Sequence, residues 1–167
     1  DEETERQMYH ETRRLLEMAG YGRYEISNYC REGYESRHNS SYWTGIPYFG
    51  AGLGASSYFY EDGAFVRTRN QQDLKAYLAG NHSYEEREVL SNEDLCEEFI
   101  FLGLRMTKGI SVRKFKKRFH KDFDILYGDR LRKLIKAGLI ERKEDRLFLT
   151  EAGLDLENYT ISELLYG

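Results

Sequence analysis

Residues 24–58 read YEISNYCREGYESRHNSSYWTGIPYFGAGLGASSY, and the rest of the chain can be read as support for this stretch. Arg23 to Tyr29 alternates with the period of two that is typical of a strand. A long polar loop is expected to follow the strand. This loop carries four candidate site residues: His38, Asn39, Tyr42 and Trp43.

The expected strand is preceded by a predicted amphipathic helix from Glu2 to Ala19, with Gly20 placed to end it. The positions that share one face of this helix are Met8, Thr12, Leu15, Leu16 and Ala19. A helix, a tight turn and a strand make the αβ step of an α/β layer or barrel. In such folds working residues gather in the loop after the strand. The loop in question holds His38.

The loop could be a chemical site. An imidazole beside an amide and two large aromatic side chains can serve as an axial ligand or a proton carrier, with flat apolar walls for a planar ligand. The structural alternative is a hydrogen-bonded loop histidine whose neighbours Tyr42 and Trp43 anchor the loop to the core. A lone histidine favours the structural alternative. The length of the loop favours function, because long unstructured connections are usually functional or disordered.

Gly50, Gly52 and Gly54 follow the loop. Their GxGxG spacing, with an aromatic and β-prone continuation, does not match a dinucleotide-binding fingerprint. If this segment is a strand, glycine at every second position leaves one face bare, so that another backbone or a planar ligand can approach. Close packing and ligand access both remain open.

Strands are expected to continue beyond the glycines. Ser56 to Tyr60 and Ala64 to Arg69 flank a Glu-Asp-Gly turn, which is a hairpin signal. A short helix is predicted from Gln71 to Ala79. Residues 81–90 are acidic and weakly periodic, so they are expected to be a linker that follows a first domain of residues 1–80.

Residues 91–167 are predicted to form a second, mostly helical domain, which begins with the capping signal Ser91 and Asp94. The further expected elements are helices Gly109 to His120 and Tyr127 to Ala137, strands Leu139 to Arg142 and Arg146 to Leu149, and a capped helix from Thr150. Three helices followed by a two-stranded wing are a winged-helix arrangement.

This second domain is basic, since residues 108–146 hold 14 basic and 6 acidic side chains. Eight of the basic residues lie on the second and third helices: Lys114, Lys116, Lys117, Arg118, Arg130, Arg132, Lys133 and Lys136. They could contact phosphates while the third helix enters a major groove. A recognition helix also needs residues that read bases, and this helix offers little besides Asp129. A solvated basic surface is therefore the alternative.

Cysteine usage and hydropathy indicate the compartment. Cys30 and Cys96 lack a partner spacing, so neither a disulfide framework nor a cysteine metal site is expected, and a reducing, cytoplasmic location is predicted. No run approaches the roughly 20 apolar residues of a membrane-spanning helix. The chain opens in a helical pattern without an initiator Met, so we expect a fragment of a longer protein. HExxH, GxSxG and P-loop motifs are missing from it, and Glu25 and Glu35 are expected to be structural.

The pattern YEISNYxxxGYxSRHNSSYWxxxxYFGAGLGAxSY resembles the oxygen-independent coproporphyrinogen III oxidase family of radical SAM proteins, and within it the HemW-type haem chaperone branch. The resemblance continues through FIFLGLRMTKGIS, Phe115 and Phe119 to GLIERKEDRLFLTEAGLDLEN. It implies an α+β fold in which the end of a radical SAM partial (β/α) barrel is followed by a winged-helix-like C-terminal domain. The missing N-terminal part of the barrel would then be a partner of this chain.

The resemblance also implies cofactors and a site. In the family a CxxxCxxC loop binds a 4Fe-4S cluster and S-adenosylmethionine. This chain lacks that loop, so cluster, S-adenosylmethionine and radical chemistry are expected only in the longer protein. The chaperone branch carries an HNxxYW motif implicated in haem binding. It maps onto His38, Asn39, Tyr42 and Trp43, with His38 as the ligand of haem iron.

Haem or a porphyrin and haem-accepting proteins are therefore the expected partners. One alternative is a fragment of a coproporphyrinogen III oxidase of porphyrin biosynthesis. The other is a winged-helix nucleic-acid-binding module. A domain that merely covers the barrel is a further interpretation of the basic C-terminal part.

Overall fold

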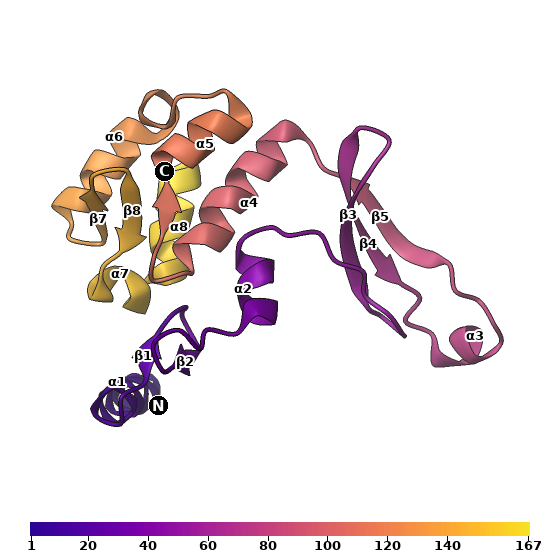
Figure 1. The fold of residues 1–167 in the computed structure, drawn as a ribbon, viewed down its shortest axis with the longest axis horizontal. Coiled ribbons are helices and arrows are strands. Elements are labelled where there is room, and N and C mark those ends of the chain that lie inside the picture. Colours follow the sequence, from indigo (N-terminus) through magenta and orange to yellow (C-terminus); the bar gives the residue numbers. More distant parts are fainter. The chain divides into compact units, whose positions relative to one another are not determined.

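The computed structural model describes residues 1–167, with side chains for all of them except residue 2. Helices and strands are mixed, as the α+β class predicts (Figure 1). The chain divides into two compact units, one made of residues 1–44 and 99–167 and the other of residues 45–98. These compact units differ from the expected domains 1–80 and 91–167. The expected domain boundaries stay a prediction.

Helix α1 (Glu2–Met18) opens the first unit, and the Asp1 side chain caps it by accepting a hydrogen bond from the Glu3 N–H at 3.2 Å. The helix was predicted, but most of its predicted apolar face is exposed, with Met8 at 65% and Leu15 at 53%, and only Leu16 of that face is half-buried. Polar side chains make contacts instead, including Tyr9, whose hydroxyl donates to the Ile26 carbonyl at 3.2 Å, and Arg13, which pairs with Glu151.

The strand predicted from Arg23 to Tyr29 is wrong, because the structure forms a tight antiparallel hairpin there. Strands β1 (Gly22–Arg23) and β2 (Tyr29–Cys30) pair around a turn. The carboxylate of Glu25 lies inside this turn and accepts hydrogen bonds from the Ser27 N–H at 3.0 Å and the Asn28 side chain at 2.5 Å. Such local side-chain bonds compete with an extended strand and fold the segment back.

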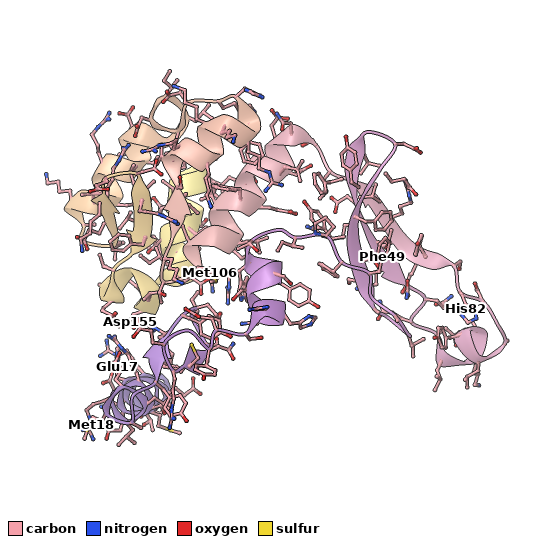
Figure 2. All side chains as sticks on the ribbon, viewed as in Figure 1. Glu17, Met18, Phe49, His82, Met106 and Asp155 are labelled. Atoms are coloured by element: carbon pink, nitrogen blue, oxygen red, sulfur yellow. The ribbon has the colours of Figure 1, made fainter. Side chains whose placement is uncertain are left out.

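The second unit contains a three-stranded antiparallel sheet in the order β3-β4-β5. Its elements are β3 (Ser56–Glu61), β4 (Ala64–Asn70), α3 (Leu74–Leu78) and β5 (Tyr84–Val89). The predicted β3-β4 hairpin is confirmed. Figure 2 labels Phe49 and His82 of this unit, and the His82 ring lies 5.0 Å from that of Tyr77 in α3.

Strand β5 lies where a linker was expected, at residues 81–90. Its side chains are exposed and lack an apolar period. Cross-strand charge pairs stabilise it instead, because Glu86 of β5 faces Arg69 of β4 and forms an ion pair with it. Opposite charges on neighbouring strands favour pairing without a hydrophobic signal.

The three glycines are not part of a strand. Gly52 and Gly54 adopt φ values of 104° and 66°. A Cβ on Gly50 would lie 2.2 Å from the Ser56 carbonyl oxygen, and the Gly50 N–H donates to the Ser57 hydroxyl at 3.0 Å. The segment turns back along β3 (Figure 1), so close packing accounts for Gly50.

The rest of the first unit is built mainly from the C-terminal half of the chain. It contains α4 (Asn92–Leu104), which begins in the second unit, β6 (Ile110–Ser111), α5 (Val112–Phe119), α6 (Phe123–Lys136), β7 (Ile140–Lys143), β8 (Arg146–Leu149), α7 (Glu151–Asp155) and α8 (Glu157–Tyr166). The strand order is β6-β8-β7. Its core includes Phe115, Phe123, Ile140, Leu147 and Leu164.

The caps of these helices follow the sequence. The Ser91 hydroxyl accepts from the Asp94 N–H at 3.1 Å, while the Asp94 carboxylate accepts from the Ser91 N–H at 2.8 Å. Ser111 and Thr150 likewise cap α5 and α7. Within the helices that the structure describes, none is long and apolar enough to cross a membrane.

Replacing Gly50 with Ala is expected to lower the free energy of unfolding by about 1–3 kcal/mol, because the new methyl group would overlap the Ser56 carbonyl. Urea denaturation measures the change. Gly22→Ala is the matched control, since a Cβ there meets nothing within 4 Å, and it should shift stability by less than about 1 kcal/mol. Equal losses in both variants would contradict the packing explanation.

Candidate functional site

The predicted site loop is a helix. Helix α2 runs from Arg37 to Trp43, and the Ser36 hydroxyl caps it by accepting from the Asn39 N–H at 3.2 Å. The C-cap residue Thr44 donates its hydroxyl to the Ser40 carbonyl at 2.9 Å. The expectation of an unstructured loop was therefore wrong. The seven residues of α2 are polar or aromatic and none is buried, so the sequence shows no apolar period by which the helix could be predicted.

The helical period sorts the four predicted site residues into two pairs. Residues four positions apart lie on the same face of a helix. His38 and Tyr42 form one pair, with their rings edge to face at 5.1 Å and the Tyr42 hydroxyl 3.2 Å from His38 Nε2. His38 is exposed and Tyr42 is half-buried, so the imidazole of this pair is presented outward.

Asn39 and Trp43 form the second pair, and this pair anchors the helix. The Asn39 side-chain amide donates to the hydroxyl of the buried residue Tyr24 at 3.1 Å. The guanidinium of Arg105 lies over the Trp43 ring, 4.6 Å from its centroid. All four motif residues are thus brought together on one short helix, and of these four only His38 is exposed.

Arg105 was missed by sequence reasoning. It follows α4 directly and donates from Nη1 to the Glu157 carboxylate at 2.6 Å. Both side chains are mostly buried, at 20% and 11% exposure. Burial raises the pKa of the Glu157 carboxyl, Arg105 opposes this rise and the nearby Glu25 charge adds to it. Arg105 lies in the segment FIFLGLRMTKGIS of the family resemblance, but no local pattern indicates its contact with Trp43, because that contact is between distant segments.

The other titratable candidates have structural partners, as expected for Glu25 and Glu35. Glu25 is 1% exposed and its carboxylate is bonded within the β1-β2 turn. Glu35 pairs with Lys108 at 3.3 Å, and a backbone hydrogen bond together with Lys108 lowers the pKa of its carboxyl. His10 lies 3.2 Å from Asp155.

The basic surface of the C-terminal part is partly used inside the domain. Arg130 donates to the Leu126 carbonyl at 3.0 Å and lies over the Tyr127 ring. Lys116 pairs with Asp122 at 3.0 Å, and Arg132 pairs with a neighbouring carboxylate of the same helix. These side chains therefore have roles that need no nucleic acid.

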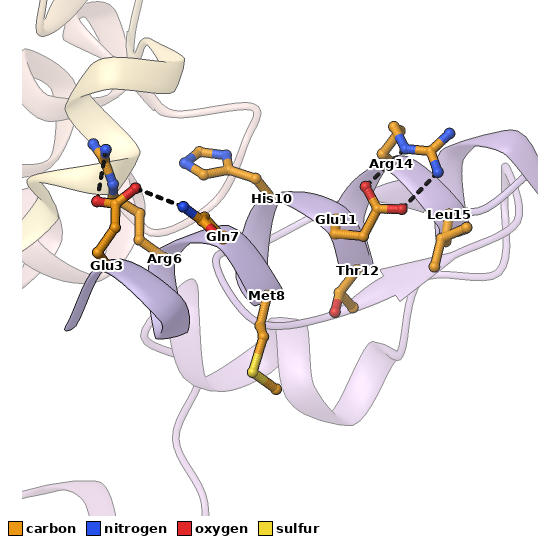
Figure 3. Close-up of a pocket in the computed structure, with 9 residues that line it drawn as sticks. All are labelled: Glu3, Arg6, Gln7, Met8, His10, Glu11, Thr12, Arg14 and Leu15. Atoms are coloured by element: carbon orange, nitrogen blue, oxygen red, sulfur yellow. Dashed lines mark hydrogen bonds and ion pairs between the residues drawn. The ribbon is translucent and has the colours of Figure 1, made fainter. Parts of the chain in front are cut away.

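The residues present do not fit an iron–sulfur cluster. Cys30 and Cys96 are free thiols in different units. Among the residues whose side chains are described, no group of three or more His, Cys, Asp and Glu could hold a metal ion. A hollow along α1 lies beside Met8 and is flanked by the pairs Glu3–Arg6 and Glu11–Arg14 (Figure 3). All its walls come from a single helix, so it offers no enclosed site.

The two pairs on α2 should differ in their effect on stability. Asn39→Ala removes the hydrogen bond to Tyr24 and is expected to lower the free energy of unfolding by about 1 kcal/mol. His38→Ala changes an exposed residue and should cost less than about 0.5 kcal/mol. Urea denaturation of both variants measures the difference, and the reverse order would contradict the assignment of anchor and presented faces.

Glu157 should make stability depend on pH. A carboxyl whose pKa is raised by folding stabilises the folded state fully below its unfolded pKa, and this contribution is lost as pH rises through the raised value. The free energy of unfolding of wild type relative to Glu157→Gln should therefore fall across that window and be flat above it. Glu163→Gln, an exposed position on the same helix, is the control. The proposed effect of Glu157 is contradicted if the free energy of unfolding of wild type relative to Glu157→Gln rises with pH.

Comparisons with known proteins extend over the site and the C-terminal part. The family described as the HemN C-terminal domain matches residues 90–156. The chain is 36% identical over 160 residues to heme chaperone HemW from Lactococcus lactis subsp. lactis (strain IL1403), covering 95% of this chain and 41% of that protein. It is 34% identical over 168 residues to heme chaperone HemW from Bacillus subtilis (strain 168), covering 98% of this chain and 43% of that protein.

A solved structure has a related fold. Coproporphyrinogen III oxidase (HemN) from Escherichia coli, a radical SAM enzyme, superposes with a TM-score of 0.68 and 16% identity, over 94% of this chain and 40% of that chain. At this identity the similarity concerns the fold alone. The chain spans less than half the length of the relatives it matches. The predicted resemblance is confirmed, and neither the oxidase nor the nucleic-acid alternative is favoured.

Proposed function

The chain is a HemW-like protein, and on that premise we propose that the outward face of α2 binds haem, with His38 as an axial ligand. The observation that supports this most directly is the division of the motif. Asn39 and Trp43 hold the helix, while the His38 imidazole is exposed beside the Tyr42 ring. A neutral imidazole nitrogen is a common ligand of haem iron, and an aromatic ring can pack on the porphyrin.

Tyr42 has a second role in the proposal. Its hydroxyl lies 3.2 Å from His38 Nε2 and orients the ring before haem arrives. An exposed hydrogen bond of this kind contributes only about 0.5–1.5 kcal/mol, so it can open to release Nε2. Asn39 and Trp43 act by holding the helix. In this proposal only His38 and Tyr42 contact the porphyrin, whereas in a haem pocket formed by the whole motif all four residues would do so.

The activity of the longer protein belongs to the same proposal. We assign to it the delivery of haem to acceptor proteins in haem metabolism, because haem chaperones are the relatives of this chain. The residues described here do not fit a 4Fe-4S cluster, so the cluster, together with the S-adenosylmethionine that would bind to it, would be held outside this chain. No chemical step is assigned to these residues beyond haem ligation.

The finer architecture is also proposed. Helix α1 would belong to the end of a partial barrel, and residues 91–167 would be a winged-helix-like domain. The order α4, α5, α6 followed by the β7-β8 hairpin supports the second assignment. A cytoplasmic location remains a prediction from cysteine usage.

Haemin titration followed by Soret absorbance tests the proposal. Wild type should give a saturable band at about one haem per chain. His38→Ala should bind at least about tenfold more weakly, since even outer-shell partners of metal ligands change affinity by about 10–100-fold. The shape of the band should also change with the loss of the imidazole.

His82→Ala is the matched control, because His82 is an exposed histidine of the other unit. It should bind haemin like wild type. The proposal is contradicted if wild type, His38→Ala and His82→Ala give the same weak, unsaturable spectrum. It is also contradicted if His82→Ala and His38→Ala weaken binding equally.

A further inference from the structure

We propose that Arg105 is a positioning residue for the haem site: through Trp43 it fixes the direction in which α2 presents His38 and Tyr42. The consequence for haem rests on the proposed function. The positioning itself does not, since it follows from contacts within the protein. Arg105 lies outside the HNxxYW motif and outside the segments that flank it.

Helix α2 cannot hold its own position. It has seven residues and none of them is buried. Isolated helices shorter than about 12–15 residues are marginal in water, and most helical stability in proteins comes from tertiary packing. The direction of α2 must therefore depend on a few side chains that reach its inner face.

Among the side chains that the structure describes, Tyr24 and Arg105 do so. Tyr24 meets Asn39 near the start of α2 through a single hydrogen bond of 3.1 Å. Arg105 covers the ring of Trp43 at the last turn, with its guanidinium carbon 4.6 Å from the ring centroid. A guanidinium stacked on an indole is a favourable cation–π arrangement, and it constrains the tilt of the ring as well as its distance.

Arg105 is itself fixed from other directions. Its backbone carbonyl accepts from the Ile26 N–H at 3.1 Å, which ties it to the β1-β2 turn. Its Nη1 donates to the Glu157 carboxylate of α8 at 2.6 Å. The ring of Phe101 lies 6.0 Å away on α4. Because Arg105 is fixed by these contacts, its guanidinium also fixes the position of the Trp43 ring.

The Glu157 carboxylate lies beside Arg105 in a place where burial disfavours its charge. Burial raises the pKa of this carboxyl, and the Glu25 charge on the β1-β2 turn raises it further. A neutral side chain would avoid this cost if stability alone mattered. The ion pair with Arg105 gives the carboxylate a role, because it holds the planar guanidinium in the orientation that the Trp43 ring needs.

Lysine cannot replace arginine in this arrangement. A guanidinium can stack by its face on one group while it donates from its edge to another, whereas an ammonium is a point charge on a flexible stem. Arg105→Lys should therefore keep the charge and lose part of the positioning. Arg105→Met, of similar length, should lose both the charge and the stacking.

Trp43 provides a direct readout because it is the single tryptophan of the chain. In Arg105→Met its fluorescence emission should shift to the red, and acrylamide should quench it more strongly. Arg105→Lys should give a smaller change in the same direction. Arg142→Lys is the matched control, because Arg142 pairs with Asp124 in the same unit, whereas the guanidinium over Trp43 is that of Arg105. It should leave both signals unchanged.

Haemin titration of the same variants measures the functional consequence. Arg105→Met should bind haemin about tenfold more weakly, the lower end of what residues orienting a metal ligand contribute. At saturating haemin its Soret maximum should match wild type, because His38 is still the ligand. His38→Ala should not reach that maximum. Recovery of part of the affinity in Arg105→Lys would distinguish positioning from a general loss of folding, which urea denaturation monitors.

The inference is overturned if Arg105→Met and Arg105→Lys both retain wild-type Trp43 emission and quenching. It is also overturned if haemin affinity falls while the Trp43 signals stay unchanged, since Arg105 would then act by another route. If wild type shows no saturable haemin band, the proposed function fails. The Trp43 measurements then still decide whether Arg105 positions α2. If wild type binds and the Arg105 variants bind equally well, the proposed function stands and this inference fails.

Discussion

The contact between the Arg105 guanidinium and the Trp43 ring is the interaction on which the site depends. The helical repeat places Asn39 and Trp43 on one face of α2, and His38 and Tyr42 on the next. A helix of seven residues is not stable by itself in water. The position of His38 therefore depends on the contacts that Asn39 and Trp43 make with the rest of the unit. Tyr24 and Arg105 hold α2 from segments that are bonded to each other, since the Thr107 N–H donates to the Tyr24 carbonyl at 3.1 Å.

The sequence was sufficient to predict those structural features that are set by neighbouring residues. The cap at Ser91, the glycine that ends α1 and the turn between β3 and β4 are set by residues within a few positions of each other. Phe115 and Phe119, four positions apart in α5, are both buried for the same reason. Such features need no knowledge of the rest of the chain.

The failures have physical causes of two kinds. At Glu25, a carboxylate bonded to neighbouring N–H groups bends a segment that alternates like a strand. Helix α2 and strand β5 have no apolar period that would predict them. The Ser36 cap stabilises α2, and the ion pair between Arg69 and Glu86 stabilises β5. Arg105 is different, because its partners Trp43 and Glu157 belong to distant parts of the sequence and only folding brings them together.

An exposed ligand suits a protein that must give up its cargo. Under the proposed function, haem bound to His38 on the outside of α2 would stay accessible to an acceptor, and the single hydrogen bond to Tyr42 would be the main local change on binding or release. A buried pocket would retain haem more strongly and would have to open for transfer. The contacts of Asn39 and Trp43 keep the helix in place while the His38 imidazole stays exposed.

The most direct test of this account follows the side-chain resonances of the four histidines by NMR while haemin is added in small amounts. Paramagnetic iron broadens nearby nuclei first. The account predicts that His38 broadens at the lowest haemin ratios while His10, His82 and His120 stay sharp. Broadening that begins at another histidine, or is equal at all four, would contradict the assignment of the haem site to α2.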